Sequence, residues 1–216
     1  SGSKGIKNKN IKKLKHKPLL SYSIKYAAKC KFVDKIVVST DSLKYAKIAM
    51  SFGAKVPFLR SKKFAGDKVR DFPVIFESLI KSEKFFKVRF DYIILLRPTS
   101  PFREKKLIEK GLKKINNFSS STSLRSVIKT SCHPYRHWKI NKSGIMISII
   151  NKIKEPFTIP RQQLPDLYFQ SGDIDIVKRN TLINGSISGN KVLPLVVKSY
   201  HDIDTLEDFK RSTNNG

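Results

Sequence analysis

The chain has 216 residues, of which 39% are hydrophobic and 28% are charged, which is enough for a single domain with an apolar core. Lysine and arginine number 44 against 17 aspartate and glutamate residues, so the formal net charge is +27. A run of ~18 consecutive apolar residues, the length of a transmembrane helix, does not occur, and no apolar leader is recognised; we therefore expect a cytoplasmic protein without a membrane partner.

Strand-like and helix-like segments alternate along the first part of the chain. Residues 34–40 (DKIVVST) are rich in β-branched side chains, and residues 91–96 (DYIILL) are the clearest buried strand. The predicted strands cover 34–40, 55–59, 91–96 and 123–129, and the predicted helices cover 43–52, 72–86 and 104–116. Such alternation predicts an α/β fold with a mostly parallel sheet and helices on both faces.

Residues 130–165 interrupt this alternation. They are rich in proline and aromatic residues and hold one short alternating apolar stretch over 145–150, which predicts an excursion from the sheet in the form of a β-arm. After the arm, strands are predicted over 168–177 and 192–198, and a last helix over 205–211. We expect residues 1–216 to form one domain.

Two segments could hold a substrate. Ligands of parallel sheets bind outside the carboxyl ends of the strands, and the polar loop 97–103 (RPTSPFR) follows a predicted strand. Its two prolines predict a rigid turn. Such a turn could position a substrate, and a purely structural turn is the alternative. The first ten residues, SGSKGIKNKN, combine glycines that can curl around a phosphate with lysines that can neutralise it. They lack the spacing of a P-loop, and a flexible terminus is the alternative.

Asp202 and Asp204 are two residues apart, so on an extended segment both side chains point to the same side. Paired carboxylates suit Mg²⁺, which completes its shell with substrate phosphates. The alternative is that Asp204 or Thr205 caps the helix that follows. Asp173 and Asp175 have the same spacing, but their alternation along a predicted strand favours polar positions on its outer face.

The high positive charge is compatible with nucleic-acid binding, because phosphates attract such a surface. The lysines, however, are scattered from Lys7 to Lys210 instead of forming one block, which favours a general compositional bias over a single binding face. Nucleic acid remains an alternative partner. An anionic substrate such as a nucleotide would be attracted by the same field.

Taken together, these segments resemble the acylneuraminate cytidylyltransferase family, also called CMP-sialic acid synthetases. The matching segments span nearly the whole chain and occur in the order SGSKGIKNKNIKKLKHKPLLSYSI, DKIVVSTDS, VPFLRSKKFAGD, DYIILLRPTSPFR, IPRQQLP and HDIDTLEDF. The resemblance implies a Rossmann-like α/β nucleotidyltransferase that joins CTP to a sialic-acid-like nonulosonic acid and releases pyrophosphate. It also implies Mg²⁺ as cofactor and a homodimer formed through an arm such as residues 130–165.

The resemblance further implies roles for individual residues. The implied nucleotide-binding residues are Ser3, Lys4, Gly5, Lys9, Asn10, Arg60 and Asp67. The implied sugar-binding residues are Arg97, Thr99, Ser100, Arg161, Gln162 and Tyr168. The implied catalytic residues are Lys4, Lys9, Asp202 and Asp204, of which the two aspartates would hold Mg²⁺.

The chain departs from the family pattern at three places. The family opens with a strand that ends in arginine just before the glycine loop, so we expect this first strand upstream of Ser1. Arg97 stands where the family commonly carries glutamine, and residues 171–173 read SGD where it carries N-G-A. Both of these changes lie in the sugar half of the site. They leave two alternatives open, a guanylyltransferase or other nucleotidyltransferase acting on a related amino sugar, and a catalytically inactive basic protein that binds nucleic acid.

Overall fold

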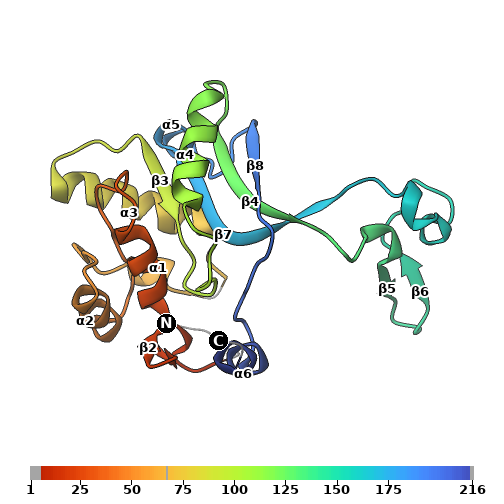
Figure 1. The fold of residues 1–216 in the computed structure, drawn as a ribbon, viewed down its shortest axis with the longest axis horizontal. Helices are drawn as coiled ribbons and strands as arrows, with labels where there is room; N and C mark the ends of the chain where they lie inside the picture. The colour runs from red at the N-terminus through yellow and green to blue at the C-terminus, as the bar shows by residue number, and fades with distance from the viewer. Residues whose placement is uncertain (1–5, 67, 215–216) are drawn as a thin grey trace.

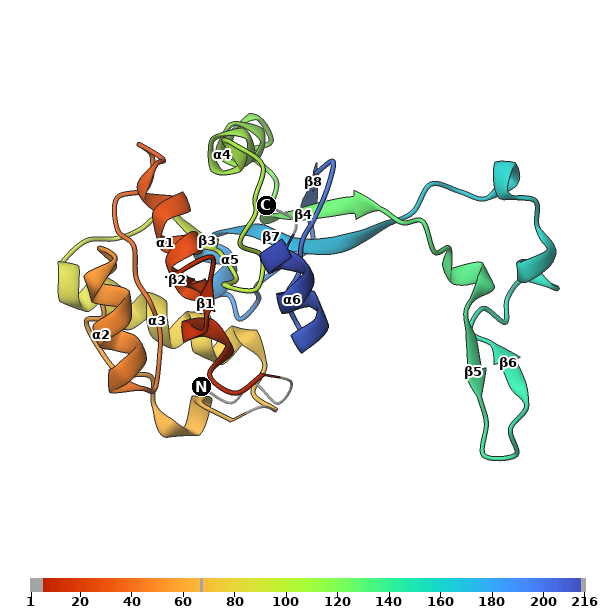
Figure 2. The same cartoon turned by 60° about the horizontal axis from the view of Figure 1, so that its bottom comes forward.

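The computed structural model describes residues 6–66 and 68–214 (Figures 1 and 2). Its centre is a four-stranded sheet whose strands, in spatial order, are β3 (Tyr92–Leu95), β7 (Tyr168–Lys178), β4 (Ser123–Lys129) and β8 (Val192–Val196). β7 runs antiparallel to β3 and β4, whereas β4 and β8 are parallel. The hydrogen-bonded sheet of the described residues is therefore mixed, and the prediction of a mostly parallel sheet is wrong. The chain leaves β4 for the arm and returns along β7 beside it, so β7 must run in the opposite direction.

Helices cover both faces of this sheet, as predicted (Figure 1). They are α1 (Leu19–Ala28), α2 (Leu43–Ser51), α3 (Asp71–Phe86), α4 (Leu107–Asn117), α5 (Arg179–Ile183) and α6 (Leu206–Asn214). Because successive side chains of a strand point to opposite faces, Ile174 and Ile176 of β7 pack in the cluster that contains α4, and Val177 packs in the cluster that contains α3 and α5. Two apolar layers thus meet on the central strand.

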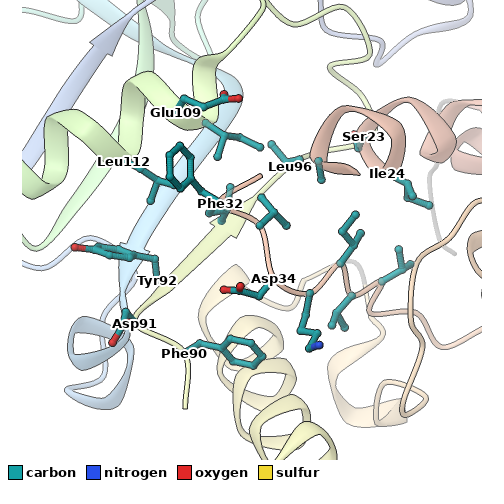
Figure 3. Close-up of a pocket in the computed structure, with 18 of the residues that line it drawn as sticks. Ser23, Ile24, Phe32, Asp34, Phe90, Asp91, Tyr92, Leu96, Glu109 and Leu112 are labelled. Atoms are coloured by element: carbon teal, nitrogen blue, oxygen red, sulfur yellow. The ribbon is translucent and has the colours of Figure 1, made fainter. Parts of the chain in front are cut away.

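Most of the predicted local elements are confirmed, including α2, α3, β3, β4, β7, β8 and α6. Helix α1 was not predicted, although Leu20, Ile24 and Ala27 recur at the spacing of one helix face and are buried. The prediction of strands over 34–40 and 55–59 is wrong, because neither segment forms a regular strand. They meet at one isolated parallel bridge, between Val37 and Lys55. Among the described residues, no strand pairs with the other edge of segment 34–40, which faces a gap beside β3 (Figure 3).

Residues 130–165 leave the body as a long extension (Figure 2). At its tip β5 (Trp138–Ile140) and β6 (Met146–Ser148) form an antiparallel hairpin, and the short 3-10 helices η3 (Pro134–Arg136), η4 (Pro156–Thr158) and η5 (Arg161–Gln163) surround its base. The hairpin exposes large apolar side chains, among them Ile140 at 73% and Ile145 at 61%. Contiguous exposed apolar residues of this kind mark an interaction surface. None of the described helices is long and apolar enough to cross a membrane.

Candidate active site at the edge of the sheet

Three distant parts of the chain meet beside the loop that follows β3. Lys9 lies in the 3-10 helix η1 (Lys9–Ile11), Thr99 lies in the loop, and Asp202 and Asp204 follow β8. The Nζ atom of Lys9 is 2.8 Å from Oδ1 of Asp204, and the backbone N–H of Ile203 donates to the carbonyl oxygen of Thr99 at 2.9 Å. The structure therefore brings together Lys9, Thr99, Asp202 and Asp204.

Ile203 explains why the two aspartates share a side. Its side chain is fully buried in a cluster with Ile6, Leu14, Leu19 and Phe209. With the middle residue of this extended segment turned inward, the residues on either side must turn outward. The pattern Asp-Ile-Asp thus presents two carboxylates at the surface because one isoleucine anchors the backbone between them.

The start of α6 shows that Thr205, one of the two capping candidates, caps this helix. Oδ2 of Asp208 accepts from the backbone N–H of Thr205 at 2.8 Å, and the N–H of Asp208 donates to Oγ1 of Thr205 at 3.1 Å. Thr205 and Asp208 thus cap the helix reciprocally, in the manner of a capping box. The Asp204 carboxylate does not serve as the cap and is directed toward Lys9 instead.

Lys9 is held in place by the turn that precedes it. The backbone of Asn8 is left-handed at φ 56°, and the N–H of Lys9 donates to the carbonyl oxygen of Ile6 at 3.1 Å. The Tyr45 hydroxyl donates to Oδ1 of Asn8 at 3.3 Å, which ties this turn to the first turn of α2. The Lys9 side chain is only 10% exposed, whereas Asp204 is 68% exposed. Neither Asn8 nor Tyr45 was identified from the sequence; asparagine's tolerance of positive φ was the available signal.

The electrostatics of the aspartate pair favour a cation. The pKa of Asp202 is raised, first by partial desolvation of its carboxyl group and then by the negative charge of Asp204. A hydrogen bond from Thr99 and the positive charge of Lys9 lower this pKa but do not offset the increase. Among the described residues, no group of three or more His, Cys, Asp or Glu side chains could hold a metal. Asp202 and Asp204 are a pair of carboxylates, and such a donor set fits Mg²⁺, since this ion is usually bound by one or two carboxylates together with substrate phosphates.

Arg103 fixes the loop that carries Thr99 and Ser100. Its guanidinium donates from Nε to the carbonyl oxygen of Asp173 at 2.6 Å, from Nη1 to Oγ of Ser23 at 3.0 Å, and from Nη2 to the carbonyl oxygen of Arg97 at 2.6 Å. Burial lowers the pKa of Arg103 to about 10. The loop is therefore held by a buried arginine as well as by its prolines. Sequence reasoning missed Arg103, whose partners lie on elements far away in the chain.

Arg97 is held between two carboxylates. Its Nη1 atom is 2.8 Å from Oδ2 of Asp175, which is 2% exposed, and its Nη2 atom is 3.2 Å from Oδ2 of Asp71, which is 59% exposed. Arg125 lies 3.7 Å from the same oxygen of Asp175. The prediction that Asp173 and Asp175 are outward polar positions is wrong, because both are buried and each lies close to an arginine. Ser100 is also buried, and its hydroxyl donates to the carbonyl oxygen of Gly172 at 3.3 Å.

The remaining predicted site residues fall in different places. Arg60 donates from Nη2 to the carbonyl oxygen of Ser39 at 2.5 Å, which places its guanidinium at the end of segment 34–40. Asn10 lies in η1 beside Lys9. Arg161 and Gln162 lie in η5 on the arm, which extends away from the body (Figure 2), and Tyr168 lies at the start of β7, 48% exposed. Ser3, Lys4, Gly5 and Asp67 lie outside the described residues.

Known proteins resemble this chain in sequence and in fold. A model of the cytidylyltransferase family matches residues 1–143. Post-translational flagellin modification protein B of Campylobacter coli is 32% identical over 97% of this chain and 88% of its own length. The CMP-N,N'-diacetyllegionaminic acid synthase of Campylobacter jejuni is 34% identical over the same shares. The solved structure of a CMP:2-keto-3-deoxy-manno-octonic acid synthetase complexed with CTP has a TM-score of 0.71, with 15% identity over 98% of this chain and 92% of that one, which is a likeness of fold. The chain therefore belongs to the cytidylyltransferase family.

Proposed function

We propose that this chain transfers a cytidylyl group from CTP to a sialic-acid-like nonulosonic acid, giving a CMP-sugar and pyrophosphate. The observation that carries the proposal is the convergence of Lys9, Thr99, Asp202 and Asp204, from both ends and the middle of the chain, at one edge of an α/β sheet. Membership of the cytidylyltransferase family and the similarity to an enzyme named for legionaminic acid support it. The helix-covered sheet with its site at strand ends supports the Rossmann-like description of the fold.

The proposed chemistry needs positioning and charge neutralisation rather than a covalent enzyme intermediate. The anomeric hydroxyl of the sugar attacks the α-phosphorus of CTP, the new O–P bond forms as the bond to the leaving pyrophosphate breaks, and the hydroxyl proton is released to solvent. Asp202 and Asp204 would hold Mg²⁺, which supplies neutralisation of the phosphate charge when it is bound. Lys9 exchanges its ion pair with Asp204 for a phosphate oxygen of the nucleotide. Arg103 keeps the loop of Thr99 rigid, so that the reacting groups meet in a productive geometry.

The site for the sugar combines contacts from the body and from the arm. Arg97, Thr99 and Ser100 belong to the rigid loop beside the aspartates, whereas Arg161, Gln162 and Tyr168 belong to the arm and its junction with β7. Since the arm extends away from the body, we expect a homodimer in which the arm of a second copy completes the site. The exposed apolar residues of the β5–β6 hairpin are the expected contact surface.

The dimer can be tested by placing a charge on the hairpin. Ile147 on β6 is 51% exposed, and Ile147→Asp is expected to convert a dimer to a monomer and to weaken sugar binding, because a buried unpaired carboxylate is costly at an interface. Ile183→Asp, at a 42% exposed position on α5 in the body, is the matched control and should leave the dimer intact. Sedimentation of both variants and of the unaltered chain measures the outcome. A monomeric unaltered chain with full activity would contradict this part of the proposal.

The activity is tested by pyrophosphate release with Mg²⁺, CTP or GTP, and sialic, legionaminic and pseudaminic acids, with glucosamine phosphate as a further acceptor. Release with CTP and one acid, abolished by EDTA and restored by Mg²⁺, is the expected result. Release with GTP alone would support the guanylyltransferase alternative. If neither this chain nor the chain with its natural upstream residues releases pyrophosphate with any member of the panel, the proposed enzyme activity is wrong. The alternative of a basic nucleic-acid-binding protein is then favoured, and its binding should weaken steeply with salt.

A further inference from the structure

Arg60 lies on a loop that is anchored at the carboxyl end of segment 34–40. Its backbone N–H donates to the carbonyl oxygen of Thr40 at 2.8 Å. Its guanidinium donates from Nε to Oγ of Ser39 at 3.2 Å and from Nη2 to the carbonyl oxygen of the same residue. These two side-chain bonds use two of the five N–H donors of an arginine and fix the plane of the group. The guanidinium is therefore oriented at a strand end, where ligands of α/β sheets bind.

A chain of contacts joins this loop to the turn that carries Lys9. Oγ1 of Thr40 accepts from the backbone N–H of Ser42 at 3.2 Å, and the Ser42 hydroxyl accepts from the N–H of Tyr45 at 3.4 Å. The Tyr45 hydroxyl in turn donates to Asn8, the residue before Lys9. The loop of Arg60 and the turn of Lys9 are thus tied to the same end of α2.

Glu77 of α3 holds the residue that follows Arg60. Its Oε2 atom accepts from the backbone N–H of Ser61 at 3.3 Å, and its Oε1 atom accepts from the Ser61 hydroxyl. The Nζ atom of Lys81, four residues on along α3, is 2.8 Å from Oε1 of Glu77 and 5.2 Å from the centroid of the Phe58 ring. One ion pair on α3 therefore contacts the loop on both sides of Arg60.

The Glu77 side chain is 10% exposed, so its carboxylate is largely removed from water. Burial raises the pKa of Glu77, but the donors of Lys81 and Ser61 lower it by more, so that this pKa is below its ordinary value. Glu77 is therefore ionised at neutral pH. Ser61 also begins the short 3-10 helix η2 (Lys62–Phe64), and its carbonyl oxygen accepts from the N–H of Phe64 at 2.9 Å, so the carboxylate holds the loop where its backbone turns.

We propose that Glu77, paired with Lys81, is a positioning residue for the nucleotide, because it fixes the loop that presents Arg60 to CTP. The inference rests on the proposed function. Apolar residues of similar size often stabilise a protein as well as a buried ion pair does, so the distinctive effect of this pair is the geometry that it imposes on Ser61. A loop that is ordered before the ligand arrives loses less entropy on binding. Glu77 acts through Arg60, so it affects the affinity for CTP rather than the chemical step.

Glu77→Gln tests the inference, because both oxygens of Glu77 accept hydrogen bonds and an amide must turn its NH2 group toward a donor of Ser61 or Lys81. The Kd for CTP and the KM for CTP are expected to rise about tenfold, whereas kcat should change less than about twofold. Glu83→Gln is the matched control, since Glu83 lies on the same helix, is 13% exposed and pairs with Arg179 at 2.7 Å. It should lower the Tm and leave the Kd for CTP unchanged.

A double variant separates positioning from a general loss of structure. Arg60→Ala should by itself raise the Kd for CTP, and adding Glu77→Gln should raise it little further, because the two residues act on one contact. An unchanged Kd in either single variant, or an additive increase in the double variant, would overturn the inference. The Kd is measured without turnover. A chain that binds CTP but releases no pyrophosphate therefore contradicts the proposed activity alone, and the Kd values still decide the role of Glu77.

Discussion

Replacement of Asp202 by asparagine is expected to lower kcat by about a hundredfold to a thousandfold, the range found when one preorganised electrostatic group is removed from a site of this kind. Asp202 and Asp204 are the two carboxylates presented by the Asp-Ile-Asp segment, and Lys9 provides one positive charge for the pair. Loss of the Asp202 charge removes half of the proposed cation site, so the apparent affinity for Mg²⁺ should fall as well.

The measurement is the rate of pyrophosphate release over a Mg²⁺ titration, with the unfolding midpoint recorded in parallel. Glu207→Gln is the matched control, because Glu207 is an acidic residue of the same region that pairs with Arg211, four residues on, at 2.9 Å on the surface of α6. It should change neither quantity. If Asp202→Asn releases pyrophosphate at the full rate at saturating Mg²⁺, Asp202 is not a catalytic residue. Because the two aspartates act as a unit, adding Asp204→Asn to Asp202→Asn should lower kcat by much less than a further hundredfold.

The largest expected loss of stability comes from Asp175→Asn, which should reduce the free energy of unfolding by about 3 kcal/mol or more, because breaking a buried ion pair leaves its partner charge uncompensated. Asp175 is almost completely buried and accepts from Arg97 at 2.8 Å, with Gln170 and Arg125 also nearby. The substitution leaves Arg97 and Arg125 close together without the buried carboxylate between them, and only the exposed Asp71 still pairs with Arg97.

Asp71 offers a matched control on the same arginine. It also pairs with Arg97, at 3.2 Å, but it is 59% exposed, and pairs of this kind contribute less than about 1 kcal/mol. Asp71→Asn should therefore be nearly neutral. Urea denaturation of both variants at neutral pH measures the difference. Equal losses for Asp175→Asn and Asp71→Asn would mean that burial does not decide the strength of these pairs.

Local patterns were sufficient for much of this protein. The buried strand predicted over 91–96 and the helices predicted over 43–52 and 72–86 depend on a few neighbouring residues, and the structure confirms these elements as β3, α2 and α3. The spacing of Asp202 and Asp204 likewise placed two carboxylates on one side, because the alternation of an extended segment is a local property.

The three-dimensional arrangement decided what depends on distant partners. The direction of β7 follows from the return of the chain from the arm, and the burial of Asp175 follows from arginines on β4 and on the loop after β3. The contact of Lys9 with Asp204 joins residues 195 positions apart. Side-chain period and propensity report the neighbours within one or two turns, whereas burial and ion pairing are set by whichever segments the fold brings together. The sequence by itself therefore determined the local elements and the family motifs, and only the tertiary structure decided the sheet order, the charge pairing and the gap beside β3.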